Sequence, residues 1–228
     1  MGMVDSERKF EGLASAVPFA LACLRQFCLP DGDHPEGCIA SIYYDTPRFA
    51  LYEEKSAGDF IKVKCRLRWY APDLSPDSDK TLAFMEVKRR VGESRRKGRQ
   101  AVSLPRAWIE NAPLDDPYFG WLLTQHALPL QEWLPPGLAA TVVIRYHRHR
   151  FVCPYTQTRV SLDTQIEGIR PNPRRLPAAG ATRLPVAVVE LKGGTADVPW
   201  LRHLRSGGFS RRSFSKYGAC MSRLLGEE

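Results

Sequence analysis

A glutamate and a lysine separated by one residue form the most chemically informative pair in this chain. On segments with the alternation of a strand the pair occurs three times, as Glu7 and Lys9, Glu86 and Lys88, and Glu190 and Lys192. Side chains two residues apart on a strand share a face, so each carboxylate would lie beside its ammonium group. Such a carboxylate can bind Mg²⁺ or Mn²⁺ while the metal bridges to phosphate oxygens that the lysine also contacts. The plainer alternative is a surface ion pair, which stabilises a protein by at most ~1 kcal/mol.

The sequence around the third pair favours a metal and phosphate site over a surface ion pair. Val188, Val189 and Leu191 surround Glu190 and Lys192. Charged side chains within such an apolar segment are rarely simple surface residues. We therefore predict that Glu190 and Lys192 bind a metal and a phosphate.

Residues 60–70 carry a second signal, because Lys62, Lys64, Arg66 and Arg68 alternate there with apolar residues. The strand that this alternation predicts has one apolar face and one face of positive charge. Neighbouring cations on that face lie about 7 Å apart and repel each other by roughly 2 kcal/mol at an effective dielectric constant near 20. The charged face therefore needs either full solvation or a bound polyanion.

A histidine pair, His147 and His149, lies within another basic stretch, 144–151. Two such histidines on a strand can bind a metal or supply a general base, but beside arginines the pattern is more typical of a solvated face. The sequence contains no phosphate-binding glycine loop, nucleophile elbow or kinase signature. Any nucleotide would therefore be bound by side chains.

The bulk composition favours an anionic partner. The 228 residues carry a net charge of +8 and 43% are hydrophobic, which predicts one globular domain over 1–228 that attracts nucleic acid, acidic lipid or a phosphate compound. The six cysteines lack the spacing of a zinc site and are expected to be reduced. No apolar segment is long enough for a signal sequence or a membrane helix, so we expect a cytoplasmic protein without a membrane segment.

The elements that must position these residues are mostly strands. Alternation predicts strands at 7–11, 38–44, 60–70, 82–90, 99–104, 141–153, 158–166 and 185–193, and a basic loop at 92–98. Helical patterns cover 15–29, 48–55, 105–112, 116–127, 197–206 and 212–225, with Ser15 as the candidate cap of the first. This order predicts an α+β protein, in which about eight strands form a closed or nearly closed antiparallel β-barrel with peripheral helices and a C-terminal helix. A barrel of this size can hold a ligand in its lumen.

Several short motifs occur along the chain in one characteristic order. They are Glu-Arg-Lys-Phe from position 7, Ile-Tyr-Tyr-Asp-Thr from 42, Lys-Val-Lys-Cys-Arg-Leu-Arg-Trp-Tyr from 62, Phe-Met-Glu-Val-Lys from 84, Arg-Val-Ser-Leu-Asp from 159, Val-Val-Glu-Leu-Lys from 188 and Phe-Ser-Lys-Tyr from 214. In this order the sequence resembles VTC domains, the polyphosphate polymerase domains of the vacuolar transporter chaperone, within the triphosphate tunnel metalloenzyme (CYTH-like) superfamily. The resemblance covers about 7–221, and the ordered set is more specific than any one motif.

The resemblance implies a tunnel-shaped antiparallel barrel that binds ATP and a polyphosphate or triphosphate with Mn²⁺ or Mg²⁺. In VTC domains the γ-phosphate of ATP is transferred to a growing polyphosphate chain. Matched motif by motif, the catalytic residues would be Glu190, Lys192, Arg66 and Arg68. The phosphate-binding residues would be Lys9, Lys88, Arg148, Arg159 and Lys216, extended by Lys62, Lys64 and Lys97. Glu190 would bind the metal, with Glu7 and Glu86 of the other two pairs as further candidates.

One departure from the superfamily bears on the reaction. Many of its hydrolases carry Glu-x-Glu-x-Lys near the N-terminus, whereas this chain has Asp5, Glu7 and Lys9 at those positions. The difference disfavours a triphosphatase, although hydrolysis of tripolyphosphate or a nucleoside triphosphate at the same site stays an alternative. A non-catalytic polyphosphate-binding module is a third possibility. Nucleic acid is the least favoured polyanion, because the interspersed glutamates would repel it and Trp69 is in phase with the apolar face.

Overall fold

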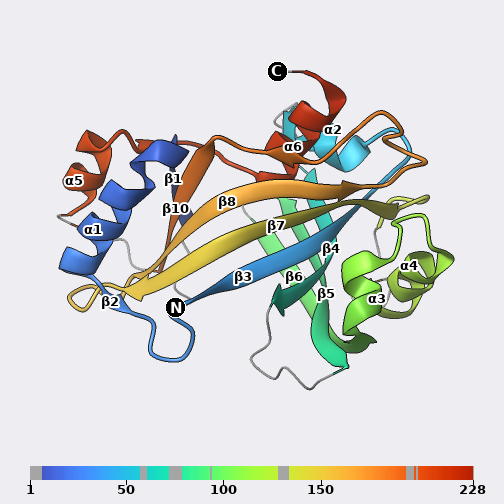
Figure 1. The fold of residues 1–228 in the computed structure, drawn as a ribbon, viewed down its shortest axis with the longest axis horizontal. Coiled ribbons are helices and arrows are strands. Elements are labelled where there is room, and N and C mark those ends of the chain that lie inside the picture. Colours follow the sequence, from blue (N-terminus) through green and yellow to red (C-terminus); the bar gives the residue numbers. More distant parts are fainter. Residues whose placement is uncertain are drawn as a thin grey trace. The chain divides into compact units, whose positions relative to one another are not determined.

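The computed structural model of the protein describes residues 7–56, 61–71, 79–92, 94–127, 134–193, 198 and 200–227 (Figure 1). The chain packs as two compact units. The first unit comprises Met1–Cys38, Tyr146–Ile166 and Arg183–Ser215, and the second comprises Ile39–Arg145, Glu167–Thr182 and Lys216–Glu228. Each unit contains its own hydrophobic core.

Antiparallel strand pairing dominates the fold. The strands are β1 (Glu7–Leu13), β2 (Leu29–Pro30), β3 (Glu36–Asp45), β4 (Ile61–Ala71), β5 (Lys80–Val91), β6 (Ser94–Pro105), β7 (Ala139–Val152), β8 (Arg159–Pro171), β9 (Thr182–Arg183), β10 (Val186–Lys192) and β11 (Ser210–Arg211). Their hydrogen-bonded order is β11-β1-β10-β8-β7-β3-β4-β5-β6, with β2 pairing with β7 and β9 with β8. The predicted antiparallel α+β fold is confirmed, although the path through the described strands is open instead of closed into a ring.

The helices are short and lie at the positions that the sequence predicts. They are α1 (Val17–Phe27), α2 (Ala50–Ser56), α3 (Arg106–Asn111), α4 (Pro117–Leu122), α5 (Leu201–Ser206) and α6 (Lys216–Leu225), with a 3₁₀ turn at Ala14–Ala16 and a π-helical turn at Leu123–Ala127. The prediction that Ser15 caps α1 is wrong, because Ser15 lies inside the 3₁₀ turn and Ala16 holds the cap position. No helix in the described part of the chain is long and apolar enough to span a membrane.

In the second unit, the alternation in β4 separates a buried apolar face from a charged one. Val63, Cys65, Leu67 and Trp69 are all buried in the core of this unit. They pack with the inward residues of β5 and with α3 and α4, which lie beside β5 and β6 in Figure 1. Since the apolar side chains occupy one face, the intervening cations are held on the other.

The predicted basic loop at 92–98 is wrong, because β6 begins at Ser94. Val91 pairs with Ser94, so β5 turns directly into β6 around Gly92, whose φ of 54° suits glycine. A run of basic residues lacks the apolar alternation that marks a strand, yet pairing with β5 supplies the hydrogen bonds that hold it extended. The basic residues of this segment are therefore placed by β5 in fixed register.

In the first unit, β10 is the central buried strand. Val189 and Leu191 pack in a core with Phe10 of β1 and with residues of α1 and α5, two helices that contact each other. Gly12 of β1 lies under the Phe209 ring, and a Cβ at this position would come within 2.9 Å of ring carbons. The other face of β10 carries Glu190, which is only 6% exposed. The prediction that Glu190 is no simple surface residue is therefore confirmed.

Candidate functional site

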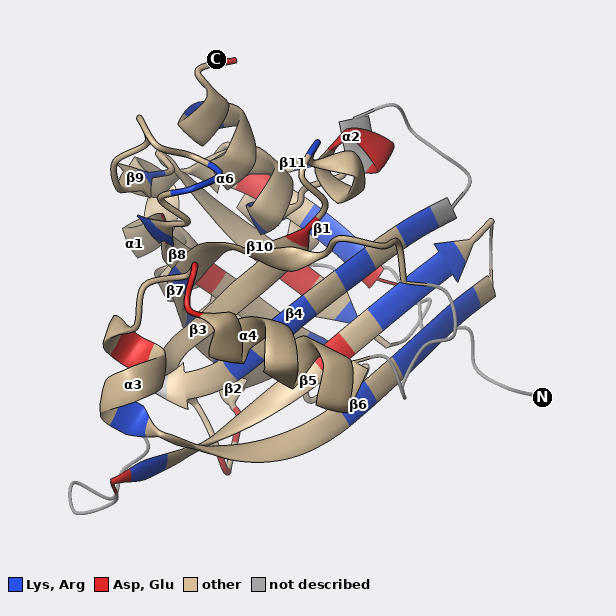
Figure 2. Ribbon diagram, turned by 90° about the vertical axis from the view of Figure 1, so that its right-hand side faces the viewer, with Lys and Arg blue, Asp and Glu red and all other residues tan. Residues whose placement is uncertain are grey.

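One face of β4, β5 and β6 in the second unit carries a dense set of basic side chains, which we call the cationic face. Strand pairing aligns its residues in rows, because partners across an antiparallel pair share a face. The rows are Lys62, Arg90 and Arg95, then Lys64, Lys88 and Lys97, then Arg66, Glu86 and Arg99, and then Arg68 and Phe84. Figure 2 shows the basic segments along these three strands.

Glu86 is the carboxylate within these rows, and it is almost fully buried among cations. Arg66 donates to Oε2 from Nε and Nη2, at 2.8 and 2.6 Å. Lys97 Nζ and Arg99 Nε lie 3.7 and 3.5 Å from Oε1. Burial raises the pKa of Glu86, but Arg66, Arg68 and Lys97 together outweigh burial and lower it to about 2. The carboxylate is therefore ionised throughout the ordinary pH range and holds Arg66 in one orientation.

Tyr43 of β3 borders the cationic face. Its hydroxyl accepts a hydrogen bond from Arg66 Nη1 at 3.2 Å. Burial raises the pKa of this phenol, but Arg66, Arg68 and Lys64 outweigh burial and lower it to about 8. Tyr217 of α6 stacks on Tyr43 with ring centres 4.9 Å apart. The phenol is thus held beside cations that strongly favour negative charge.

Two further contacts orient arginines of the cationic face. Arg68 donates from Nε to Ser41 Oγ at 3.2 Å. The Arg99 guanidinium carbon lies 3.6 Å from the centre of the Phe84 ring, a cation–π contact. Guanidinium groups with fixed orientation can present paired N–H donors to phosphate oxygens.

The first unit contains a second group of charges on β7, β8 and β10, which we call the carboxylate cluster: Arg148, Asp163, Glu190 and Lys192. Asp163 is fully buried and accepts from Arg148 Nε and Nη2 at 2.6 and 2.7 Å. Arg148 Nη2 also donates to Glu190 Oε2 at 3.2 Å. Burial alone would lower the pKa of Arg148, but Asp163 and Glu190 help to raise it well above its ordinary value. Arg148 is therefore a permanent buried cation with a bidentate partner.

Glu190 lies farther from Arg148 than Asp163 does. Its contacts include the 3.2 Å hydrogen bond from Arg148 and a 3.3 Å ion pair between Oε1 and Lys192 Nζ. Mg²⁺ and Mn²⁺ at phosphate sites usually take one or two carboxylates and complete their shell with phosphate oxygens and water. A buried glutamate beside a lysine fits that donor set.

Strand pairing brings the remaining predicted residues of the first unit next to the carboxylate cluster. On β10, Glu190 pairs with Lys9 and Ser161, and Lys192 pairs with Glu7 and Arg159. Lys9 Nζ lies 3.0 Å from Glu7 Oε1 and donates to the Phe214 carbonyl at 3.2 Å. Asp5, the third position of the N-terminal motif, lies outside the described residues.

The predicted site residues thus fall into two groups. The second unit brings together Lys62, Lys64, Arg66, Arg68, Glu86, Lys88 and Lys97, and the first unit brings together Glu7, Lys9, Arg148, Arg159, Glu190 and Lys192. Lys216 is the first residue of α6, directly before Tyr217. Tyr217 stacks on Tyr43, and the Tyr43 hydroxyl accepts a hydrogen bond from Arg66. Lys216 is therefore one residue away from the edge of the cationic face.

Sequence reasoning missed three residues of these groups. Asp163 is in phase with Arg159 and Ser161 on one strand face, a signal that was available. Arg99 was assigned to the start of a strand after a supposed loop, which hid its register with Glu86. Tyr43 lies in an apolar strand and carries no sequence signal for its contact with Arg66.

Comparison with known proteins identifies a family for this chain. The family model of the VTC domain matches residues 28–225. Subunit 4 of the vacuolar transporter chaperone complex from Trypanosoma brucei brucei is 27% identical over 225 residues, covering 82% of this chain but 28% of that protein. The chain thus spans less than a third of the length of this relative.

Solved structures support the fold alone. A candidate adenylate cyclase from Bacillus halodurans aligns with a TM-score of 0.52 at 15% identity, over 94% of this chain and 96% of its own. A second candidate adenylate cyclase, from Vibrio parahaemolyticus, aligns over 97% and 99% of the two chains at 15% identity, but its TM-score of 0.46 is too low to support an argument. The family model covers most of the sequence, and the chain therefore belongs to the VTC domain family.

Proposed function

We propose that this chain is a metal-dependent polyphosphate polymerase, which transfers the γ-phosphate of ATP to a growing polyphosphate chain. Membership of the VTC domain family supports the proposal. The observation that carries it is the cationic face, where rows of lysine and arginine from three strands surround Glu86. A cytoplasmic location, expected from the sequence, is part of the same proposal.

The charge of the cationic face suits a chain of phosphates better than a single small anion. Each internal phosphate of a polyphosphate carries one negative charge, and the cations repeat along β4 at the spacing of alternate residues, about 7 Å. Arg66 and Arg68 have fixed partners in Glu86, Tyr43 and Ser41, so they are oriented before a phosphate arrives. Preoriented donors stabilise developing charge without a reorganisation cost at the moment of reaction.

The carboxylate cluster would hold the metal through Glu190, with Lys192 as the neighbouring phosphate contact. A bound Mn²⁺ or Mg²⁺ would neutralise charge on the phosphoryl group that is transferred. Asp163 fixes Arg148, and Arg148 in turn positions the Glu190 carboxylate. Phosphoryl transfer of this kind depends on positioning and charge neutralisation, and a phosphate terminus is already ionised near neutral pH, so no dedicated general base is needed.

The test is an assay of products from ATP and Mn²⁺, separated on a gel, with the purified chain. Long polyphosphate chains from the wild type, and none from Glu190→Gln, are expected. Glu167→Gln is the matched control, because Glu167 forms a separate ion pair with Arg145. Orthophosphate as the sole product would make the protein a hydrolase, and tight polyphosphate binding without turnover would make it a binding module. Either result would overturn the polymerase proposal.

A further inference from the structure

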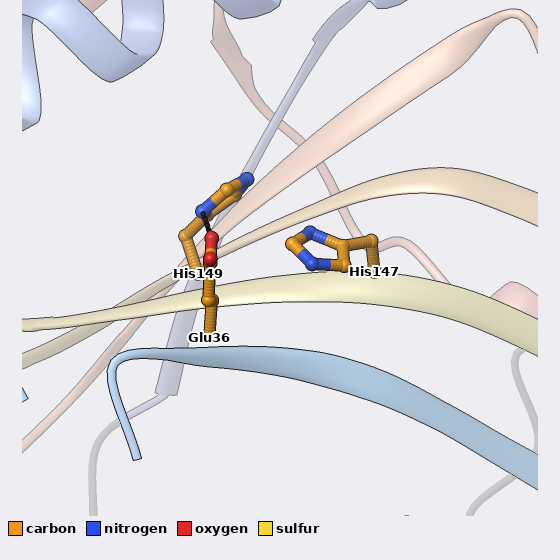
Figure 3. A group of neighbouring side chains, drawn as sticks. All are labelled: Glu36, His147 and His149. Atoms are coloured by element: carbon orange, nitrogen blue, oxygen red, sulfur yellow. Dashed lines mark ion pairs between the residues drawn. The ribbon is translucent and has the colours of Figure 1, made fainter. Parts of the chain in front are cut away.

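Outside the two groups of charges, the first unit holds a cluster of one glutamate and two histidines. Glu36 begins β3, and His147 and His149 are alternate residues of β7 (Figure 3). Each residue offers one potential ligand atom, and these three atoms all lie within 4.8 Å of one another. Glu36 Oε2 is 3.2 Å from His149 Nδ1, and the two imidazole rings have centres 4.6 Å apart.

The backbone holds Glu36 next to these histidines. Arg150, the residue after His149, donates its backbone N–H to the Pro35 carbonyl at 2.7 Å, directly before Glu36. The Arg150 side chain donates to the His34 carbonyl at 3.1 Å. Since β3 and β7 are neighbouring strands and Arg150 anchors the start of β3, the three side chains are brought together by the fold and not by chance contact of long side chains.

We propose that Glu36, His147 and His149 form a binding site for one divalent transition-metal ion of the zinc class. Two imidazoles and one carboxylate are a common protein ligand set for Zn²⁺, with water in the fourth position. Ligand atoms in a tetrahedral zinc site are separated by about 3.3 Å, given metal–ligand bonds of about 2.0–2.1 Å. The Glu36–His149 separation of 3.2 Å is close to this value, and the ligand atom of His147 lies within 4.8 Å of the other two.

This site is chemically distinct from the metal position proposed at Glu190. Imidazole ligands favour Zn²⁺, Co²⁺ and Ni²⁺, whereas a carboxylate with phosphate oxygens favours Mg²⁺ and Mn²⁺. His147 and His149 flank Arg148 in β7, so their side chains leave the strand on the opposite face from Arg148. The site therefore does not depend on the proposed phosphotransferase activity.

The experiment measures zinc bound to the full chain. Metal-stripped protein is incubated with Zn²⁺ in a phosphate-free buffer, desalted, and analysed for metal content, and Co²⁺ is added in parallel to record its visible spectrum. One equivalent of zinc is expected for the wild type. Glu36→Gln and His149→Ala should each lower the zinc affinity at least tenfold, whereas Glu190→Gln should retain it.

A control variant sharpens this measurement. His34→Ala removes an exposed histidine close in sequence but outside the three-residue cluster, and should leave zinc binding unchanged. The proposal is overturned if wild type and His149→Ala bind zinc equally, or if the Co²⁺ spectrum reports thiolate ligands from cysteine side chains.

Discussion

The cationic face and the carboxylate cluster both join arginine to carboxylate across antiparallel strands, but they differ in charge balance. On the cationic face, Glu86 stands among rows of lysine and arginine. In the carboxylate cluster, Asp163 and Glu190 face Arg148 and Lys192. The first arrangement has a large surplus of positive charge, and the second is nearly neutral.

This difference suggests different roles for the two buried carboxylates Glu86 and Glu190. Glu86 receives two hydrogen bonds from Arg66 and is surrounded by further cations, so it acts to orient arginine. Glu190 shares Arg148 with Asp163, which holds the shorter contacts. Because its contact with Arg148 is longer than those of Asp163, Glu190 is the carboxylate that we propose as the metal ligand.

The largest expected effect is on stability, from Asp163→Ala. The substitution leaves Arg148, whose side chain is 14% exposed, without its bidentate partner. Loss of one member of a buried ion pair typically costs about 3–5 kcal/mol. Urea unfolding should therefore show a drop of this size, against at most ~1 kcal/mol for Glu167→Gln in the more exposed Arg145 pair. Equal losses in the two variants would contradict the buried-pair assignment.

Substitutions of Glu190 and Glu86 should have different effects on turnover and on substrate affinity. We expect Glu190→Gln to lower turnover by about 10²–10³, the range for loss of one charge-stabilising group in an active site. Glu86→Gln should mainly weaken the affinity for ATP and tripolyphosphate, because Arg66 loses its orientation. Turnover and affinity are measured separately by initial rates and calorimetry. A larger loss of turnover in Glu86→Gln than in Glu190→Gln would reverse the assignment.

The acid stability of the protein should depend on Glu86. Its pKa of about 2 in the folded state lies below the ordinary 4.5, so the unfolded chain binds the proton first as the pH falls. The stability that this carboxylate contributes is present above pH 4.5 and is lost as the pH falls towards 2, by up to about 3 kcal/mol. Across this range the free energy of unfolding should fall more steeply with decreasing pH in the wild type than in Glu86→Gln. The same pH dependence in both proteins would contradict the cationic environment of Glu86.

The smallest effect concerns Tyr43. Because its pKa is about 8, the phenol becomes negatively charged above that pH, beside Arg66 and Arg68. We expect the affinity for tripolyphosphate to fall about fivefold through this range, equivalent to roughly 1 kcal/mol of charge repulsion. Tyr43→Phe cannot ionise at this position and should keep its affinity between pH 7 and 9. A Tyr43→Phe profile that falls like the wild type would exclude this phenol as the cause.

Much of this arrangement was visible in the sequence, because period-two alternation is a local property. The alternation at 60–70 predicted β4 and its two faces, and the apolar context of Glu190 predicted its burial. Where the local pattern was absent, the prediction failed. The basic segment at 92–98 was read as a loop, although pairing with β5 makes most of it strand.

The sequence by itself determined which residues share a strand face, since that follows from neighbours along the chain. It thereby identified the glutamate–lysine pairs and the row of cations on β4. Only the tertiary structure decided which carboxylate meets which arginine, because those contacts join strands that are distant in sequence. Asp163 with Arg148, Tyr43 with Arg66, and Glu36 with His149 are contacts of this kind. These contacts form because of the register in which the strands pair, and that register depends on two segments of the chain at once.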